Sequence, residues 1–267
     1  MGKVIAIWGS PNSGKTTLSI KLAKELAKEK SVIVLFSDIL APVIPILKED
    51  IDVKKSLGNV LSTAKLTNEE ILKNCIEIDN IKNIGFLGYT QNENIFTYPQ
   101  YSQERVNELI SSLRELADYV IIDATSNFVN DLITTIALEV SDSVLRLNSS
   151  ELKNISYYDS YLPLLIDTKF DTDNHINILS NFRIDDAVEE LIELYSAKES
   201  IAYSDEVREQ GACNELLLSL SSKEESKLSS KLKNIISMIN IDETKIDETN
   251  IEKEKKKGLF KRFRKGA

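Results

Sequence analysis

The sequence is poor in cysteine and histidine, the residues that build zinc sites and disulfide frameworks. Its 267 residues include two cysteines, Cys75 and Cys213, and a single histidine, His175. The cysteines lie far apart, with no C-x-x-C pattern and no neighbouring histidine, so neither a disulfide nor a zinc site is indicated. His175 opens a strand-like apolar run, which favours a structural role over catalysis by a histidine base. The function must therefore depend on other side chains.

Long apolar runs are also lacking. No apolar stretch approaches the roughly 18 residues that a membrane-spanning helix needs. The first residues lead directly into a strand-like run instead of a signal peptide, so we expect a cytoplasmic protein. Apolar residues make up 42% of the chain and only five residues are proline, which is typical of a globular protein with one main domain.

Positive charge is scarce outside the C-terminus. Residues 253–267 contain eight Lys or Arg and one Glu, a net charge of +7 in a chain of net charge −9. Residues 1–252 therefore carry a net charge of −16. An acidic body argues against a broad nucleic-acid surface, and we expect no DNA binding.

What the sequence does contain is a glycine-rich loop in a suitable context. Residues 9–16 read GSPNSGKT and match the phosphate-binding pattern G-x-x-x-x-G-K-[ST] at every fixed position. An apolar run at residues 3–8 precedes the loop, and residues 16–30 follow with helical spacing. Backbone N–H groups of such a loop surround phosphates, while the lysine neutralises them and the Thr hydroxyl can ligate Mg²⁺. The nucleotide-binding residues that we expect are Gly9, Ser10, Pro11, Asn12, Ser13, Gly14, Lys15, Thr16 and Thr17.

Two aspartates follow apolar strands. Residues 31–36 (SVIVLF) and 119–123 (YVIID) read as buried parallel strands, with Asp38 just past the first and Asp123 at the end of the second. Because ligands bind at the carboxyl ends of strands in open parallel sheets, we expect both aspartates at the same edge of the sheet as the glycine-rich loop, the P-loop. Asp123 has the position of a Walker B aspartate, which holds Mg²⁺ or its water. From the residues alone, a solvated loop aspartate explains Asp38 equally well.

Strand-like and helix-like segments alternate through the remaining sequence. We expect strands at 83–87, 143–147 and 176–179, and helices at 67–75, 106–116, 185–195 and 222–239, with one more ending at 165. Residues 89–101 form a polar, aromatic loop, either packed on the surface or in contact with a partner or nucleotide. The alternation predicts an α/β fold with a mostly parallel, doubly wound sheet flanked by helices.

The C-terminus divides into two segments of different charge. We expect an ATPase domain at residues 1–240, a flexible acidic linker at 241–254 and a basic amphipathic tail at 255–267. In a helix, one apolar edge of the tail is flanked by cations that suit anionic headgroups. The expected membrane-binding residues are Leu259, Phe260, Lys261, Arg262, Phe263, Arg264 and Lys265. A basic tail that binds DNA phosphates is the alternative, but it explains the two phenylalanines poorly.

Several segments, in the right order, resemble the MinD/ParA group of P-loop ATPases. GSPNSGKTT resembles the nucleotide loop of the group, VIVLFSD the strand that ends at switch I, and ADYVIIDAT the Walker B strand. ILSNFR resembles a segment whose asparagine, here Asn181, reads the adenine edge, and KKKGLFKRFRKGA resembles the membrane-targeting tail of MinD. The resemblance covers most of residues 1–240 and the tail.

The resemblance implies a set of roles and partners. Lys15 and Asp38 are the implied catalytic residues, and Thr16, Asp38 and Asp123 the implied Mg²⁺ site. ATP and Mg²⁺ are the implied cofactors. The implied partners are a second copy in an ATP-dependent homodimer, an anionic membrane surface on the cytoplasmic face, and a protein that the sequence does not identify.

Two departures from the group bear on catalysis. The group usually has a signature lysine that reaches across the dimer, and Ser10 occupies that position, as in the atypical CpaE/TadZ-like members. The group also has Pro and Gly after the Walker B aspartate, where a glycine N–H senses the terminal phosphate, whereas residues 124–127 here are ATSN. We therefore expect only slow hydrolysis of ATP to ADP and phosphate.

Three functions are compatible with these features. The first is an ATP-switched, membrane-associated protein that positions a cellular machine for division, a flagellum, a pilus or conjugation. The second is a P-loop enzyme that phosphorylates a small molecule, which explains the P-loop but not the basic tail. The third is a nucleotide-binding scaffold without catalysis, which the departures at Ser10 and residues 124–127 favour.

Overall fold

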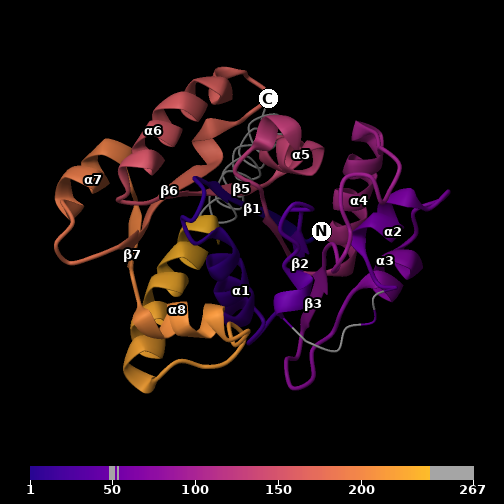
Figure 1. Ribbon diagram of the computed structural model, residues 1–267, viewed down its shortest axis with the longest axis horizontal. Helices are drawn as coiled ribbons and strands as arrows, with labels where there is room; N and C mark the ends of the chain where they lie inside the picture. Colours follow the sequence, from indigo (N-terminus) through magenta and orange to yellow (C-terminus); the bar gives the residue numbers. More distant parts are fainter. Residues whose placement is uncertain (48–51, 53, 241–267) are drawn as a thin grey trace, which may run out of the picture.

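A seven-stranded sheet forms the framework of the protein. The computed structural model describes residues 1–47, 52 and 54–240. The strands are β1 (Lys3–Gly9), β2 (Val32–Phe36), β3 (Ile84–Leu87), β4 (Tyr119–Asp123), β5 (Ser143–Asn148), β6 (His175–Phe182) and β7 (Glu199–Ala202). Their order is β3-β2-β4-β1-β5-β6-β7, and each neighbouring pair is parallel (Figure 1). The predicted fold class is confirmed.

Helices cover both faces of this sheet. They are α1 (Lys15–Leu26), α2 (Leu57–Ser62), α3 (Asn68–Asn74), α4 (Gln103–Leu116), α5 (Leu132–Val140), α6 (Leu152–Tyr161), α7 (Val188–Tyr195) and α8 (Asp205–Ala212), followed by a helix at residues 222–240. Helix α1 and the helix 222–240 pack on one face, and α4 and α5 pack on the other (Figure 1). None of the helices in the described part of the chain is both long and apolar enough to cross a membrane.

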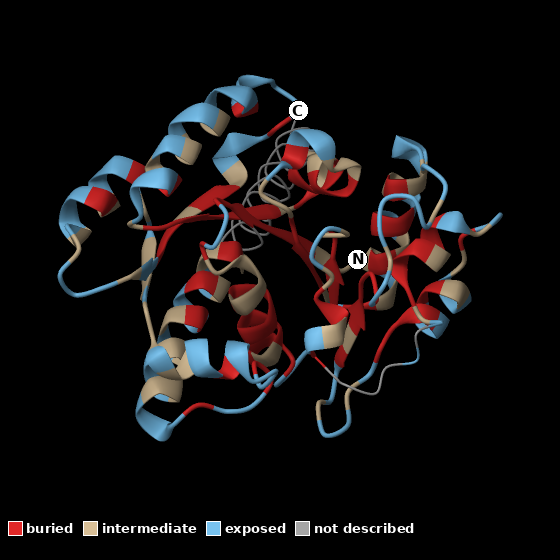
Figure 2. Cartoon of the chain, in the orientation of Figure 1, coloured by how far each residue is buried: buried red, intermediate tan, exposed pale blue. Residues whose placement is uncertain are grey.

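Strand β1 shows why the central strands read as continuous apolar runs. Its side chains alternate, so that Val4, Ala6 and Trp8 join the core under α4 and α5, whereas Ile5 and Ile7 join the core under α1. Figure 2 shows the sheet buried between helices whose outer faces are exposed. Each fully buried aliphatic side chain here stabilises the fold by about 1.5–3 kcal/mol. The strands thus hold the P-loop on a rigid base.

Some elements differ from the sequence-based expectation. Helix α1 ends at Leu26 instead of residue 30, and α6 ends at Tyr161, after which Leu162–Ile166 form a 3₁₀ helix instead of more α-helix. Pro163 explains the second difference, because proline lacks the N–H that an α-helix needs and its ring clashes with the preceding turn of an α-helix. Strand β7 was not predicted, since it is short, partly polar and only half-buried.

Candidate nucleotide-binding site

The P-loop connects the carboxyl end of β1 to the N-terminus of α1, and both of its fixed glycines have a structural reason. Gly14 caps α1 in a left-handed conformation, with φ 88° and ψ 19°, which glycine adopts without strain. A Cβ atom at Gly9 would lie 2.1 Å from the backbone oxygen of Leu147 on β5. A side chain at Gly9 would therefore displace the loop, and a side chain at Gly14 would strain its backbone. Beyond it, the first N–H groups of α1 lack partners within the helix, as a phosphate site at a helix N-terminus requires.

Hydrogen bonds from both sides hold the shape of the loop. The Ser13 hydroxyl donates to the backbone oxygen of Ser10 at 2.8 Å, within the loop itself. The Ser180 hydroxyl, from β6, donates to the backbone oxygen of Ser13 at 2.7 Å. Ser180 was not predicted, because only the sheet order brings residue 180 next to residue 13. The shape of the P-loop is thus fixed by β6 as well as by hydrogen bonds within the loop.

The Lys15 ammonium group is held at the mouth of the cradle. It donates to the backbone oxygen of Ser10 at 2.9 Å and to the hydroxyl of Ser126 at 2.7 Å. Burial lowers the pKa of Lys15, and the charges of Asp123 and Asp38 oppose this shift. The two carboxylates thus do not fully compensate the burial of the Lys15 charge. Phosphate oxygens of a bound ligand would stabilise the charged ammonium group further.

Thr16 and Asp123 form the core of a possible Mg²⁺ site. The Thr16 hydroxyl donates to the Asp123 carboxylate at 2.6 Å, and the Ser19 hydroxyl donates to its other oxygen at 3.2 Å. Burial raises the pKa of Asp123 to about 6, although Thr16, Lys15 and Ser19 favour its ionised form. Hydroxyl and carboxylate oxygens are the hard ligands that Mg²⁺ prefers.

The described residues do not by themselves enclose a metal ion. No group of three or more His, Cys, Asp or Glu that could hold a metal exists among them. This pattern fits Mg²⁺ that completes its octahedron with phosphate oxygens and water, as Mg²⁺ does in nucleotide sites. The residues present therefore suit a nucleotide–Mg²⁺ pair better than a dedicated metal centre.

Asp38 lies on the same rim, as the sequence predicts. It follows β2 and lines the pocket that Lys15 and Asp123 also line. One of its carboxylate oxygens accepts hydrogen bonds from the backbone N–H groups of Leu40 at 2.8 Å and Ala41 at 3.2 Å. Asp38 thus stabilises the turn of its own loop, and its negative charge also favours the charged form of Lys15.

The opposite wall of the pocket comes from the loops after β6 and β7. Asn181, which interrupts the pairing of β6 with β7, is exposed and has a left-handed backbone with φ 58°. Next to it, the Arg183 guanidinium lies 4.6 Å from the centre of the Tyr203 ring. All three residues line the pocket. The sequence indicated Asn181 only through the family resemblance and did not indicate Arg183 or Tyr203.

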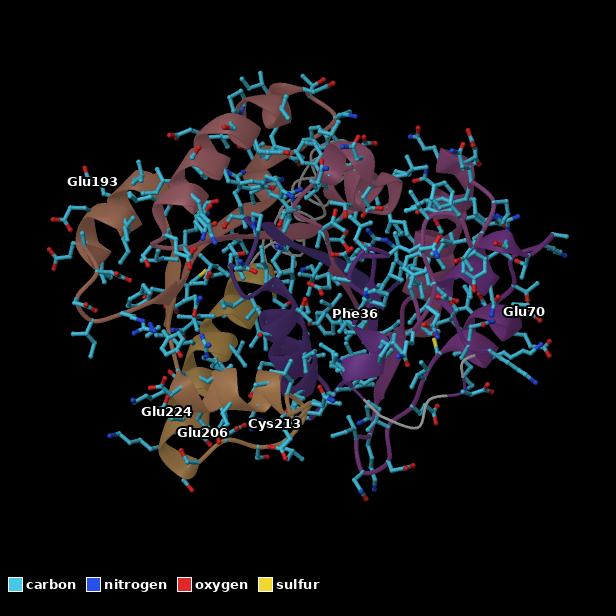
Figure 3. All side chains as sticks on the ribbon, viewed as in Figure 1. Phe36, Glu70, Glu193, Glu206, Cys213 and Glu224 are labelled. Atoms are coloured by element: carbon cyan, nitrogen blue, oxygen red, sulfur yellow. The ribbon has the colours of Figure 1, made fainter. Side chains whose placement is uncertain are left out.

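The lower part of this wall is formed where α8 meets the helix 222–240. Ser221 links the two, because its hydroxyl donates to the Glu206 carboxylate of α8 at 2.7 Å. Figure 3 shows Glu206 and Glu224 close together at this junction. Glu224 lines the pocket, so the pocket extends well beyond the P-loop.

The aromatic loop at residues 89–101 is packed and also borders the pocket. The Glu93 carboxylate accepts hydrogen bonds from the Ser56 hydroxyl and from the Thr90 N–H, both at 2.7 Å. The Tyr98 ring lies against Gly58, where a Cβ atom would come within 2.0 Å of the ring. Ile95 lines the pocket and is 58% exposed. The loop is therefore a fixed part of the rim.

Together these segments enclose one large open pocket. Its volume is 1890 Å³, and it is lined by residues from the P-loop, from 37–43, 89–101, 123–132, 180–185 and 201–211, and from the helix 222–240. Small-molecule sites usually measure roughly 300–1,000 Å³. The pocket therefore has room for more than a nucleotide. The predicted tail residues 259–265 lie outside the described part of the chain.

Comparison with known proteins agrees with this site. A family model described as an AAA domain matches residues 2–156, more than half of the chain. The chain belongs to this family of AAA-domain proteins. No curated protein sequence matches the chain.

Several solved structures share the fold of this chain. The chain is similar to a proposed plasmid partition protein of Borrelia burgdorferi B31 bound to AMPPNP, with a TM-score of 0.71, 20% identity and coverage of 89% of this chain and 99% of the other. It is similar to MinD of Pyrococcus horikoshii OT3 with Mg-ADP, with a TM-score of 0.69, 18% identity and coverage of 90% and 98%. It is also similar to a ParA family ATPase of Chlorobium tepidum TLS, with a TM-score of 0.73, 14% identity and coverage of 87% and 99%. The expected MinD/ParA-like fold is confirmed.

Proposed function

We propose that the protein binds ATP with Mg²⁺ and uses the nucleotide state to control self-association at a membrane, where it positions a cellular machine. The observation that supports the nucleotide part best is the Thr16–Asp123 hydrogen bond of 2.6 Å, with Lys15 beside it in a preformed P-loop. The Borrelia and Pyrococcus relatives, which hold AMPPNP and Mg-ADP, support the same ligands here. The machine is one for division, a flagellum, a pilus or conjugation.

Each site residue has a role in this proposal. Residues 9–17 surround the phosphates with backbone N–H groups, and Lys15 neutralises their charge. Thr16, Asp38 and Asp123 hold Mg²⁺ or its water, and Asp38 orients the attacking water. Asn181 contacts the base. Bound Mg²⁺ supplies charge neutralisation of the phosphate oxygens.

Hydrolysis is slow in this proposal because a serine stands at the position of the signature lysine. Ser10, at the position of the signature lysine, is only 1% exposed, and its hydroxyl has no hydrogen-bond partner within the described residues. It cannot place positive charge on a neighbouring phosphate. A cation that stabilises developing phosphate charge increases rates by about 10³–10⁵ in related phosphoryl-transfer enzymes.

The rim of the pocket supports an ATP-dependent homodimer. Three apolar residues that line the pocket are exposed: Leu40 by 83%, Ile95 by 58% and Ile184 by 101%. Apolar side chains are stabilised when a partner removes them from water. A second copy seated over the pocket would bury them and close a volume that a nucleotide alone does not fill. An unidentified protein partner would then bind the dimer.

Membrane association rests on the sequence of the tail. Three apolar side chains flanked by cations suit an interfacial helix on anionic lipid. One such tail binds weakly, whereas two tails on one dimer bind together by effective concentration. Nucleotide-dependent dimerisation would thereby control peripheral binding of a cytoplasmic protein to the cytoplasmic face of the membrane.

Two other functions have a feature in their favour. Ser10 and the altered residues 124–127 favour a nucleotide-binding scaffold without catalysis. The large pocket favours a P-loop enzyme with room for a small second substrate.

Two measurements on the full-length protein separate the three functions. The first is molar mass by light scattering with Mg-ATP, with Mg-ADP and without nucleotide; the second is ATP turnover with and without anionic liposomes. A positioning ATPase should be a dimer with Mg-ATP, but not with Mg-ADP or without nucleotide, and should hydrolyse ATP slowly. Absence of turnover in every condition favours the scaffold, and fast turnover that requires an added small substrate favours the small-molecule enzyme. A monomer in every nucleotide state contradicts the proposed switch.

A further inference from the structure

The loop after β4 places a hydroxyl group beside the P-loop lysine. Ser126 is the third residue after Asp123, it lines the pocket, and its hydroxyl oxygen lies 2.7 Å from the Lys15 ammonium nitrogen. We propose that the Ser126 hydroxyl contacts the terminal phosphate of bound ATP and thereby distinguishes ATP from ADP. This inference rests on the proposed function, because it concerns the same nucleotide site.

The hydrogen-bonding capacity of the two groups supports this contact. An ammonium group has three donors, and Lys15 directs two of them to the Ser10 backbone oxygen and to the Ser126 hydroxyl. A serine hydroxyl that accepts one hydrogen bond still has its own proton to donate. No described residue receives that proton. A phosphoryl group bound by the remaining donor of Lys15 would present its oxygens to the rotating Ser126 hydroxyl.

Helix α6 fixes Ser126 in this position. The Tyr157 hydroxyl donates to the backbone oxygen of Ser126 at 2.5 Å. The Tyr157 ring stacks on Tyr161, with ring centres 4.4 Å apart, and lies 5.9 Å from the ring of Trp8, which directly precedes the P-loop. Ser126 is thus held between Lys15 and a layer of aromatic rings. A residue held from both sides contacts a ligand without a large ordering cost.

The local sequence explains why a side chain takes this role. Residues 124–127 are Ala, Thr, Ser and Asn, so this loop contains two hydroxyl groups. The Thr125 hydroxyl lies 3.5 Å from the Asp131 carboxylate, whereas the Ser126 hydroxyl lies 2.7 Å from the Lys15 ammonium nitrogen. Ser126 is therefore the residue of this loop whose hydroxyl lies at the phosphate site.

The test compares ATP and ADP binding, measured by calorimetry with Mg²⁺ on the full-length protein. Ser126→Ala should weaken ATP binding by about 10- to 100-fold, the value of one hydrogen bond to a charged group, and change ADP binding by less than about 2-fold. Ser126→Thr keeps the hydroxyl and should keep the ATP preference. The matched control is Ser180→Ala, which removes a support of the loop backbone and should affect both nucleotides equally. Thermal unfolding of each variant establishes that it is folded.

Tyr157→Phe gives a second, independent reading. It removes the hydrogen bond to the Ser126 backbone and keeps the ring stack, so it should reduce the ratio of ATP to ADP affinity in the same direction as Ser126→Ala. Equal effects of Ser126→Ala on ATP and ADP, or no effect on either, would overturn the inference and leave nucleotide binding intact. A parent protein that binds neither nucleotide would overturn the proposed function itself.

Discussion

Thr16 and Asp123 are 107 residues apart in the chain, yet the Thr16 hydroxyl donates a 2.6 Å hydrogen bond to the Asp123 carboxylate. The parallel pairing of β1 with β4 sets this contact, because Ile7 lies opposite Asp123 at the end where the P-loop begins. The two oxygens that suit Mg²⁺ are therefore positioned by the register of two central strands. Their spacing does not depend on a mobile loop.

Asp123→Asn should remove the dependence of ATP affinity on Mg²⁺. An amide oxygen has no net charge and neutralises none of the ion, whereas the buried carboxylate does. Calorimetry of ATP binding with Mg²⁺ and with EDTA measures the effect, and the two values should converge in the variant. Ser19→Ala is the control, since Ser19 contacts the same carboxylate at 3.2 Å and should retain the Mg²⁺ dependence.

The same substitution should leave the folded protein without nucleotide at least as stable. Burial raises the pKa of Asp123 from 3.8 to about 6, so its ionised form destabilises the fold at neutral pH. Two pKa units correspond to about 3 kcal/mol at most. Urea unfolding at pH 7 without nucleotide tests this expectation, and marked destabilisation of Asp123→Asn would contradict it.

Lys15→Ala should weaken ATP binding by about 10- to 100-fold or more, because each charge-assisted hydrogen bond contributes about 1.5–3 kcal/mol. The matched control is Lys24→Ala on the same helix, outside the residues that line the pocket. Calorimetry with Mg-ATP compares parent, variant and control. Equal affinity in Lys15→Ala and the parent would refute the nucleotide site.

His175 should make the stability of the fold depend on pH. It is 5% exposed, and its Nδ1 lies 2.6 Å from a guanidinium nitrogen of Arg146. Burial and the Arg146 charge lower the pKa of His175 from 6.5 to about 3. Below pH 6.5 the unfolded chain therefore binds a proton at His175 that the folded chain does not bind. The free energy of unfolding decreases as the pH falls. Between pH 6.5 and 5 the loss is about 2 kcal/mol at 1.36 kcal/mol per unit.

Urea unfolding of the parent and of His175→Gln between pH 5 and 7.5 measures this effect. The buried Asp123 acts in the opposite direction, since its raised pKa lets the folded state bind a proton first. The comparison with His175→Gln isolates the histidine, and the parent should lose more stability on acidification than the variant. Equal slopes would mean that the pKa of His175 is the same in the folded and unfolded chain, which would contradict the prediction. As the only histidine, it also gives a single imidazole signal by NMR.

The sequence predicts the parts of the site that lie in short, regular patterns. The P-loop, the aspartates after β2 and β4 and the apolar central strands all have local signals, because a strand buried on both faces must be apolar throughout. Contacts such as that of Lys15 with Ser126, 111 residues apart, depend on the sheet order β4-β1-β5-β6 instead. No local pattern encodes that order.

The far wall of the pocket escaped prediction for a different reason. Strand β7 lies at the edge of the sheet and is only partly buried, so it tolerates polar residues such as Glu199 and Ser200. It therefore lacks the continuous apolar run that identifies a buried strand. In α8 the one buried residue is Gln210, so the helix lacks an apolar stripe. Arg183 and Tyr203, which meet at this wall, therefore have no sequence signal of their own.

The tail at residues 255–267 carries three large apolar side chains among basic residues. Burying Leu259, Phe260 and Phe263 contributes at most about 2 kcal/mol each, and each nearby cation about 1 kcal/mol at an anionic surface. Ordering a segment of this length offsets much of that gain. One tail should bind weakly, and two tails on an ATP-bound dimer should bind far more strongly.

We therefore expect ATP to increase the sedimentation of the protein with anionic liposomes. Salt should weaken this binding by screening the cations, and neutral liposomes should bind little protein. Phe260→Glu or deletion of residues 255–267 should abolish it, because a carboxylate cannot enter the apolar layer. Ile166→Glu is the matched control, since Ile166 is 80% exposed on the folded body, lies outside the tail and does not line the pocket. Liposome binding that is indifferent to Phe260→Glu, or tail-dependent retention of DNA, would show that plain electrostatic attraction explains the tail.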